Sequence, residues 1–273
     1  MQTRTVVKKN YGPLLFLLLW GVYSFIYYYL KQDPVLKNFL GWTSFSTSAI
    51  LTFIAVTYSL ILWQKSTGRA QRIFGFFSVS LLCIFITNLI YQILFNVLEV
   101  SHDSISNIVL SSYNIPYLVF LFLQLLIWLM FITKIRFSQG KVKGLSLYIP
   151  IFIIVLAFSL FFLFPFNWNL KNISLADIYN IVSLFLQIAG CLAAFLCMFA
   201  FKNRGVFYLA LSFVIISGTD LIMNFDFFSQ SYGVHSLVEV GWILGVFFRI
   251  YGLFTIKKHK YYDVLPENWV YVD

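Results

Sequence analysis

Two carboxylates, Asp220 and Glu239, lie within long apolar stretches of the sequence. A charged group in a hydrocarbon-like interior needs a partner, water or a bound proton, so such residues are rare where they have no task. We therefore take Asp220 as a candidate for binding a ligand or exchanging a proton. For a single Asn, Ser or Thr in the same stretches, the simpler interpretation is a hydrogen bond between helices.

Further polar residues follow these acids at helical spacing. Asp220 lies three residues after Ser217 and four before Asn224, so all three share one helical face. An earlier apolar stretch carries Asn180 and Gln187 seven residues apart, again on one face. We expect polar groups from several helices to line one ligand-binding pocket. The residues assigned to it are Asp220, Asn224, Glu239, Trp242, Asn88, Gln92, Asn180 and Tyr117.

The residue types that carry metal, cofactor or nucleophilic chemistry do not form a motif here. Cys83, Cys191 and Cys197 are isolated in apolar sequence, so we expect neither a disulfide nor a metal site. The three histidines are too far apart for an H-E-x-x-H helix, and no nucleophile-elbow, Walker or dinucleotide motif occurs. We expect no metal and no cofactor, and we favour a non-enzymatic protein over an intramembrane enzyme.

The elements that position these residues must be membrane helices. Of the 273 residues, 60% are hydrophobic and 11% charged, whereas a soluble domain carries about 25% charged residues. The apolar stretches are continuous rather than alternating, which argues against a barrel. Eight of them are long enough for a helix of about 20 residues to cross the bilayer core. These spans are 11–30, 42–64, 73–98, 109–133, 145–166, 175–201, 206–228 and 235–256.

The fold class predicted is an all-α, polytopic helical bundle of about eight transmembrane helices. Residues 1–256 form its single transmembrane domain, and residues 257–273 form a short cytoplasmic tail that is too short to fold alone. The loops are short, and no internal repeat is visible.

Orientation follows from the basic residues, because Lys and Arg collect in cytoplasmic loops. Of the 19 Lys and Arg residues, fifteen fall in the segments that are cytoplasmic when the N-terminus is inside, three fall outside and one lies in a span. We therefore expect a multi-pass plasma (inner) membrane protein with both termini cytoplasmic. This distribution also explains the net charge of +9 as contact with the lipid bilayer, so no nucleic-acid partner is expected.

The predicted orientation of the spans determines how deep in the bilayer the pocket lies. Spans alternate in direction, so the outer half of the bilayer holds the late residues of 73–98 and 206–228. It also holds the early residues of 42–64, 109–133, 175–201 and 235–256. The assigned polar residues lie there, which predicts a pocket opening outward between the second, third, fourth, sixth, seventh and eighth spans. The first and fifth spans carry few polar groups and are expected to face lipid.

Arg249 stands apart because it lies in the inner half of the last span. The first interpretation is that its side chain snorkels to the inner headgroups. The alternative is that it joins a charge network that shifts when the pocket fills, and we name it as the candidate for signal coupling. A direct bond to Glu239 is not expected, because ten residues rise about 15 Å along a helix.

The last span reads Glu239-Val-Gly-Trp-Ile-Leu-Gly245, and an earlier span contains Tyr113-Asn-Ile-Pro-Tyr-Leu. An acid before Gly-Trp-Ile-Leu-Gly in the final helix, after a helix with two tyrosines four residues apart, resembles the multi-span sensor regions found ahead of bacterial histidine kinase or diguanylate cyclase domains. The two glycines alone are equally explained as a helix-packing face. The resemblance implies ligand sensing and a cytoplasmic signalling domain or partner protein. In this chain only a short tail follows the last span.

Three functions follow from these observations. The first is a sensory module in which a small molecule or lipid fills the outer pocket and biases the inner ends of the last helices. The second is a small secondary transporter, although midplane sites with broken helices in related halves are typical of that class. The third is an intramembrane lipid-modifying enzyme.

Overall fold

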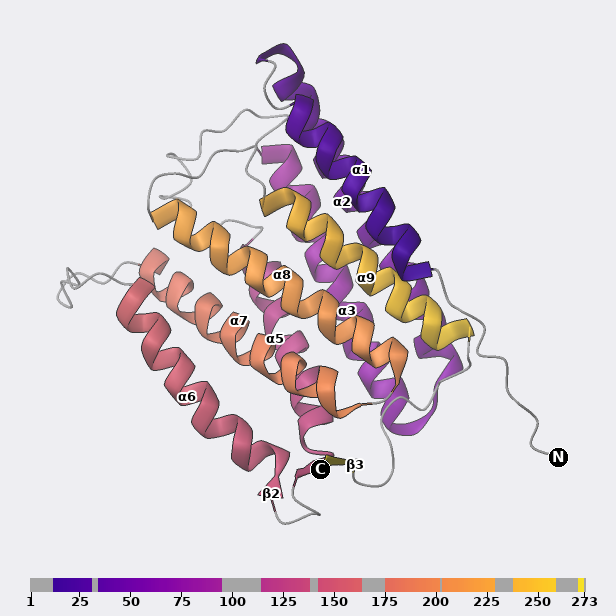
Figure 1. The fold of residues 1–273 in the computed structure, drawn as a ribbon, viewed down its shortest axis with the longest axis vertical. Helices are drawn as coiled ribbons and strands as arrows, with labels where there is room; N and C mark the ends of the chain where they lie inside the picture. Colours follow the sequence, from indigo (N-terminus) through magenta and orange to yellow (C-terminus); the bar gives the residue numbers. More distant parts are fainter. Residues whose placement is uncertain are drawn as a thin grey trace.

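The computed structural model describes residues 12–30, 34–94, 114–137, 142–163, 175–201, 203–228, 238–258 and 270–272. This part of the chain is a helical bundle with one very small sheet (Figure 1). Its helices are α1 (Gly12–Leu30), α2 (Pro34–Lys65), α3 (Gly68–Gln92), α5 (Asn114–Ile132), α6 (Gly144–Leu163), α7 (Leu175–Ala200), α8 (Arg204–Phe228) and α9 (Val238–Lys258).

Each of the eight predicted spans coincides with one of these helices, so the all-α membrane bundle is confirmed. Seven of the described helices are long and apolar enough to cross a membrane, and α6 is apolar over Gly144–Ala157, where its described side chains end. The largest difference is at the start of α2, which begins at Pro34, eight residues before the predicted span. Proline is favoured in the first turn of a helix because its missing N–H is not needed there.

Six helices close into a ring. Going around it, α9 packs on α8, α8 on α7, α7 on α5, α5 on α3, α3 on α2, and α2 again on α9. These are the six spans that the sequence predicts around a pocket. The ring encloses an aromatic core in which Phe120 and Trp128 of α5 both contact Phe213 of α8.

The two remaining helices lie outside the ring, α1 against α9 and α6 against α7, at opposite edges of the bundle (Figure 1). Both turn large apolar side chains outward, including Phe25 of α1 at 73% exposure and Ile154 of α6 at 68%. Unpaired apolar surface of this extent is typical of helices that face lipid. The expectation for the first and fifth spans therefore agrees with their position.

The helix α1 is attached to α9 in an antiparallel arrangement. Near its start, Phe16 contacts the rings of Phe247 and Tyr251. Further along, the Trp20 indole Nε1 donates to the carbonyl oxygen of Val240 at 2.8 Å. Because of these contacts, α9 is held between α1 on one side and its ring neighbours on the others.

A three-stranded sheet joins the loop between α5 and α6 to the end of the chain. Its strands are β1 (Ile135–Phe137), β2 (Val142–Lys143) and β3 (Val270–Val272), in the order β2-β1-β3. The pair β1 and β2 is antiparallel, whereas β3 joins β1 in parallel. These strands were not predicted from the sequence. The tail was expected not to fold alone, and its residues 270–272 form a strand by pairing with β1.

The pairing of the tail can be tested by cross-linking. Neighbouring strands lie about 4.8 Å apart, which is within the range of about 4.4–6.8 Å between the Cα atoms of a disulfide. Because Arg136 and Tyr271 are partners in the register, Arg136→Cys with Tyr271→Cys should form a disulfide under mild oxidation in a chain whose native cysteines are replaced by Ala. Gel mobility before and after reduction measures it.

The matched control for this cross-link is Arg136→Cys with Val270→Cys, one position out of register. It should oxidise more slowly because its two side chains leave the pleat on opposite faces. Equal rates for the two pairs would contradict the parallel register.

Candidate functional site

The carboxylate of Asp220 joins three helices of the ring. Its Oδ2 accepts a hydrogen bond of 2.6 Å from the hydroxyl of Tyr117 on α5. Its Oδ1 accepts a bond of 2.5 Å from the indole Nε1 of Trp242 on α9. Gln187 of α7 adds a fourth helix, since its Nε2 donates to the Tyr117 hydroxyl at 2.8 Å. We call Tyr117, Gln187, Asp220 and Trp242 the Asp220 network.

The helices bring these four side chains to a common depth. Position 220 is sixteen residues after the start of α8, and position 242 is sixteen residues before the end of α9, so each lies about 24 Å from the end of the bundle where α8 begins and α9 ends. Tyr117 lies fifteen residues before the end of α5, or about 22 Å by the same rise. Antiparallel neighbours therefore meet at one level, beyond the middle of the spans.

Burial strengthens these hydrogen bonds and limits the access of other groups to the Asp220 carboxylate. Asp220 is only 3% exposed, and Gln187 is 2% exposed. Hydrogen bonds to a charged acceptor are shorter and about twice as strong as those between neutral groups, and low dielectric strengthens them further. Each carboxylate oxygen accepts one of these bonds, so a ligand that binds Asp220 competes with the hydroxyl of Tyr117 or the indole of Trp242 for its acceptor sites.

Arg249 is inside the ring, and the interpretation that it snorkels to the inner headgroups is wrong. Its side chain is 2% exposed, and its guanidinium lies over the ring of Phe120 with the central carbon 5.7 Å from the ring centroid. The physical reason is that α9 is covered by α1, α2 and α8, which leaves no exposed path from this face of α9 to the headgroups.

The guanidinium of Arg249 and the carboxylate of Asp220 attract one another electrostatically. The Nη2 atom of Arg249 is buried and has no hydrogen-bond partner within the described residues. Phe120 packs against Tyr117 as well as under the guanidinium, so the aromatic layer between the two charges belongs to α5. The alternative prediction, a charge network that includes Arg249, agrees with this arrangement.

Of the eight residues assigned to the pocket, the structure brings Tyr117, Asp220 and Trp242 together. Asn88 lies elsewhere in the ring, where its Nδ2 approaches the Ser48 hydroxyl of α2 at 3.5 Å. Asn180 lies about two turns from Gln187, nearer the start of α7. Asn224, Glu239 and Gln92 lie in helices whose backbone is described, but their side chains fall outside the described residues.

Gln187 is the member of the network that the sequence analysis left out of the pocket. The signal was present, because Gln187 shares a helical face with Asn180. Other polar side chains tie pairs of helices together, as Gln124 Nε2 does by donating to the Ser80 hydroxyl at 2.7 Å. These ties fit the simpler interpretation of single Asn, Ser and Thr residues.

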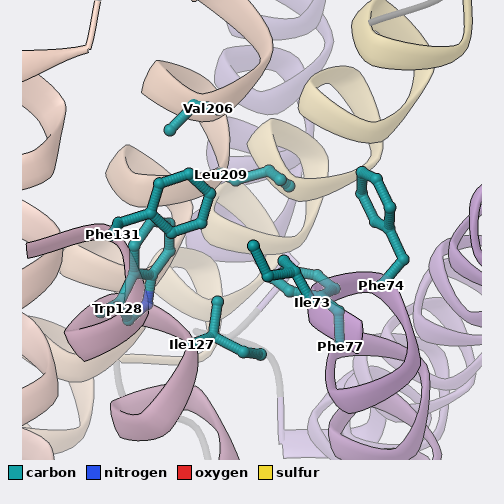
Figure 2. Close-up of a pocket in the computed structure, with 8 residues that line it drawn as sticks. All are labelled: Ile73, Phe74, Phe77, Ile127, Trp128, Phe131, Val206 and Leu209. Atoms are coloured by element: carbon teal, nitrogen blue, oxygen red, sulfur yellow. The ribbon is translucent and has the colours of Figure 1, made fainter. Parts of the chain in front are cut away.

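A separate crevice lies nearer the other end of the ring, between α3, α5 and α8 (Figure 2). Its cavity volume is about 10 Å³, which is room for about one water molecule, and its walls are apolar and aromatic. The lining residues are Ile73, Phe74, Phe77, Ile127, Trp128, Phe131, Val206 and Leu209. None of them belongs to the Asp220 network, so this crevice offers nothing that would bind a charged or polar ligand.

The described residues contain no cluster of His, Cys, Asp or Glu that could hold a metal ion. Comparison of the chain with protein-family models, with curated proteins and with solved structures found no match. The site itself is therefore the basis on which a function is proposed.

Proposed function

We propose that this membrane protein is a sensory module in which a ligand changes the hydrogen bonds of Asp220 and thereby moves α9. The observation that carries the proposal is that one buried carboxylate holds Tyr117 of α5 and Trp242 of α9 at the same time. A small molecule or lipid that takes either place releases one helix from α8. The ligand is proposed to enter from the outer side, where the Asp220 network lies when both termini are cytoplasmic.

The movement has a route to the other end of the bundle. The helix α9 also carries Arg249, whose charge is attracted by Asp220, and it leads to the tail that pairs with β1. A shift of α9 therefore reaches the segment between α5 and α6 as well as the basic end of the bundle. We propose that a cytoplasmic signalling domain or protein reads this end, in the plasma (inner) membrane.

Tyr117→Phe tests the coupling without knowledge of the ligand, because it removes the hydroxyl donor to Asp220 and keeps the ring. We expect spin labels at Lys65→Cys and Lys258→Cys, at the ends of α2 and α9, to change their separation. Double electron–electron resonance on the full chain in lipid nanodiscs measures the distance distribution. Its mean should shift or its width should grow by a few Å, the scale of helix shifts in known switches.

The matched control is Tyr148→Phe, which also loses one buried hydroxyl. That hydroxyl donates to the carbonyl of Ala189 at 2.9 Å, between α6 and α7, away from α9. We expect this variant to keep the original distance distribution. Identical distance distributions in Tyr117→Phe and the unsubstituted protein, with folding intact, would contradict the sensory proposal.

A secondary transporter is the second candidate, and one observation favours it. Two ionisable side chains of opposite sign, Asp220 and Arg249, are buried in the interior of the ring, and such residues commonly mark ion pathways and proton relays. Uptake of a radiolabelled solute into proteoliposomes, abolished by Asp220→Asn, would decide for transport. The helices of the Asp220 network are unbroken over their described lengths, whereas transporter sites are often formed by broken helices.

A further inference from the structure

Among the described residues, neither of the two charges in the ring has a partner of opposite charge at bonding distance. Asp220 is held by two neutral donors, Tyr117 and Trp242. Arg249 faces a neutral ring, and its Nη2 has no hydrogen-bond partner among the described residues. We propose that the ligand of this site is a small zwitterion, whose cationic group binds Asp220 while its anionic group binds Arg249. This inference rests on the proposed function and names its ligand class.

Charge balance favours a zwitterion over other small ligands. Asp220 and Arg249 together carry no net charge, and both are buried. An added cation or anion would leave one unit of charge uncompensated in a medium of low dielectric, which is strongly unfavourable. A neutral molecule avoids that penalty but leaves the guanidinium without an anion. A zwitterion adds no net charge and gives each buried ion a partner of opposite charge.

The helix directions bring the two charges toward one another. Arg249 lies seven residues after Trp242 on α9, or about 10 Å along the axis. Side chains in a helix lean toward its N-terminus. Because α8 and α9 are antiparallel, Arg249 leans toward the level of Trp242, whereas Asp220 leans toward the level of Arg249. The two charged groups therefore lie closer together than the positions of their helices alone would place them.

Aromatic side chains lie beside both charges. Tyr117 and Phe120 pack together on α5, and Trp242 approaches Asp220 from α9. Aromatic faces attract ammonium groups, including methylated ones. The aromatic side chains therefore favour the cationic end at Asp220, with the anionic end left for Arg249, the one described basic side chain that faces the network.

An isosteric series tests the charge requirement directly. Glycine betaine is the zwitterion, tert-butylacetate is the anion of the same shape, and choline is the corresponding cation; glycine and β-alanine vary the spacing of the zwitterionic charges. Binding to the full chain in nanodiscs is measured by calorimetry at constant ionic strength. We expect at least one zwitterion to bind about 10–100-fold tighter than the anion and the cation, because each of those lacks the contact with one of the two buried charges.

Substitutions should invert this preference in opposite directions. Asp220→Asn leaves a net positive interior, so tert-butylacetate should become the preferred ligand. Arg249→Gln leaves a net negative interior, so choline should become preferred. Arg249→Lys keeps the charge and should keep the preference for zwitterions. This variant still tests the role of the charge if Arg249→Gln does not fold. Arg204→Gln is the matched control, because Arg204 is exposed at the start of α8 and its loss should leave the ligand order unchanged.

Two results would overturn the inference. One is that none of the three zwitterions binds tighter than tert-butylacetate or choline. The other is that the three variants Asp220→Asn, Arg249→Gln and Arg249→Lys all show the same order of ligand affinities. If the distance between the labels at positions 65 and 258 still changes in Tyr117→Phe, the sensory proposal holds and only the zwitterion is excluded as its ligand.

Discussion

Asp220→Leu should lower the free energy of unfolding by about 3–5 kcal/mol, the cost of leaving a buried charge without its compensating partner. The substitution removes the acceptor for Tyr117 and Trp242, and it removes the negative charge that offsets Arg249. Asp220→Asn should cost less, because the amide oxygen still accepts one hydrogen bond. Reversible unfolding in mixed detergent micelles, followed by tryptophan fluorescence, measures the difference.

A double-mutant cycle separates the charge from the hydrogen bonds. Arg249→Met removes the guanidinium while keeping an unbranched side chain, and it should be destabilising alone because Asp220 is then uncompensated. In the double variant Asp220→Leu with Arg249→Met no buried charge remains, so the loss should be smaller than the sum of the two single losses by about 1–3 kcal/mol. Strict additivity would show that the two groups do not compensate one another.

The arrangement of the ring follows from the sequence to a large extent. Polar residues mark the stretches that must face protein, and stretches without them can face lipid. This reasoning separated α1 and α6 from the six helices of the ring, because apolar composition is a property of each stretch alone. It also placed Asp220, Trp242 and Tyr117 at one depth, since span direction and helical rise fix the level of each residue.

The surroundings of a side chain are harder to predict than its depth. The sequence places Arg249 about one or two turns from the basic end of its span, from which snorkelling is physically reasonable. The outcome depends on which neighbours cover that face of α9, and those are α1, α2 and α8. Gln187 was passed over for a related reason. Its face was known, but its partner Tyr117 lies 70 positions away.

The small sheet could not be predicted from the sequence. Its strands are two or three residues long, which is too short to show alternation between polar and apolar residues. Pairing of β1 with β3 joins segments on either side of four helices, and no local pattern specifies such a partner. The strands form because the ends of the helices bring them together.

Gly245→Ala should destabilise the pair of helices that carries both buried charges. A Cβ at this position of α9 would lie 2.4 Å from Cγ1 of Ile216 and 3.2 Å from the backbone oxygen of Ser212, both on α8. A carbon cannot come that close, so either Ile216 changes its rotamer or α9 moves away from α8. Overpacking of this kind costs about 1–3 kcal/mol, measurable by the same detergent unfolding.

Gly218 provides the control, because a Cβ there meets no atom within 4 Å. Gly218→Ala should be neutral or stabilising, since Ala is the better helix former by about 1 kcal/mol. If the two Ala variants lose the same stability, close packing at Gly245 is not what holds α9 in place. Ile216→Ala combined with Gly245→Ala should recover part of the loss by removing the obstructing branch, which would assign the cost to this contact.

The consequence of Gly245→Ala for the site follows from its place on α9. Gly245 lies three residues after Trp242 and four before Arg249, so a displacement there moves both side chains that face Asp220. The bond of 2.5 Å between Trp242 and Asp220 leaves little tolerance for a shift of α9. We therefore expect Gly245→Ala to change the distance between the labels at positions 65 and 258 in the same sense as Tyr117→Phe, although it alters no polar group. A change in stability without a change in that distance would separate the packing of α9 from its proposed role in signalling.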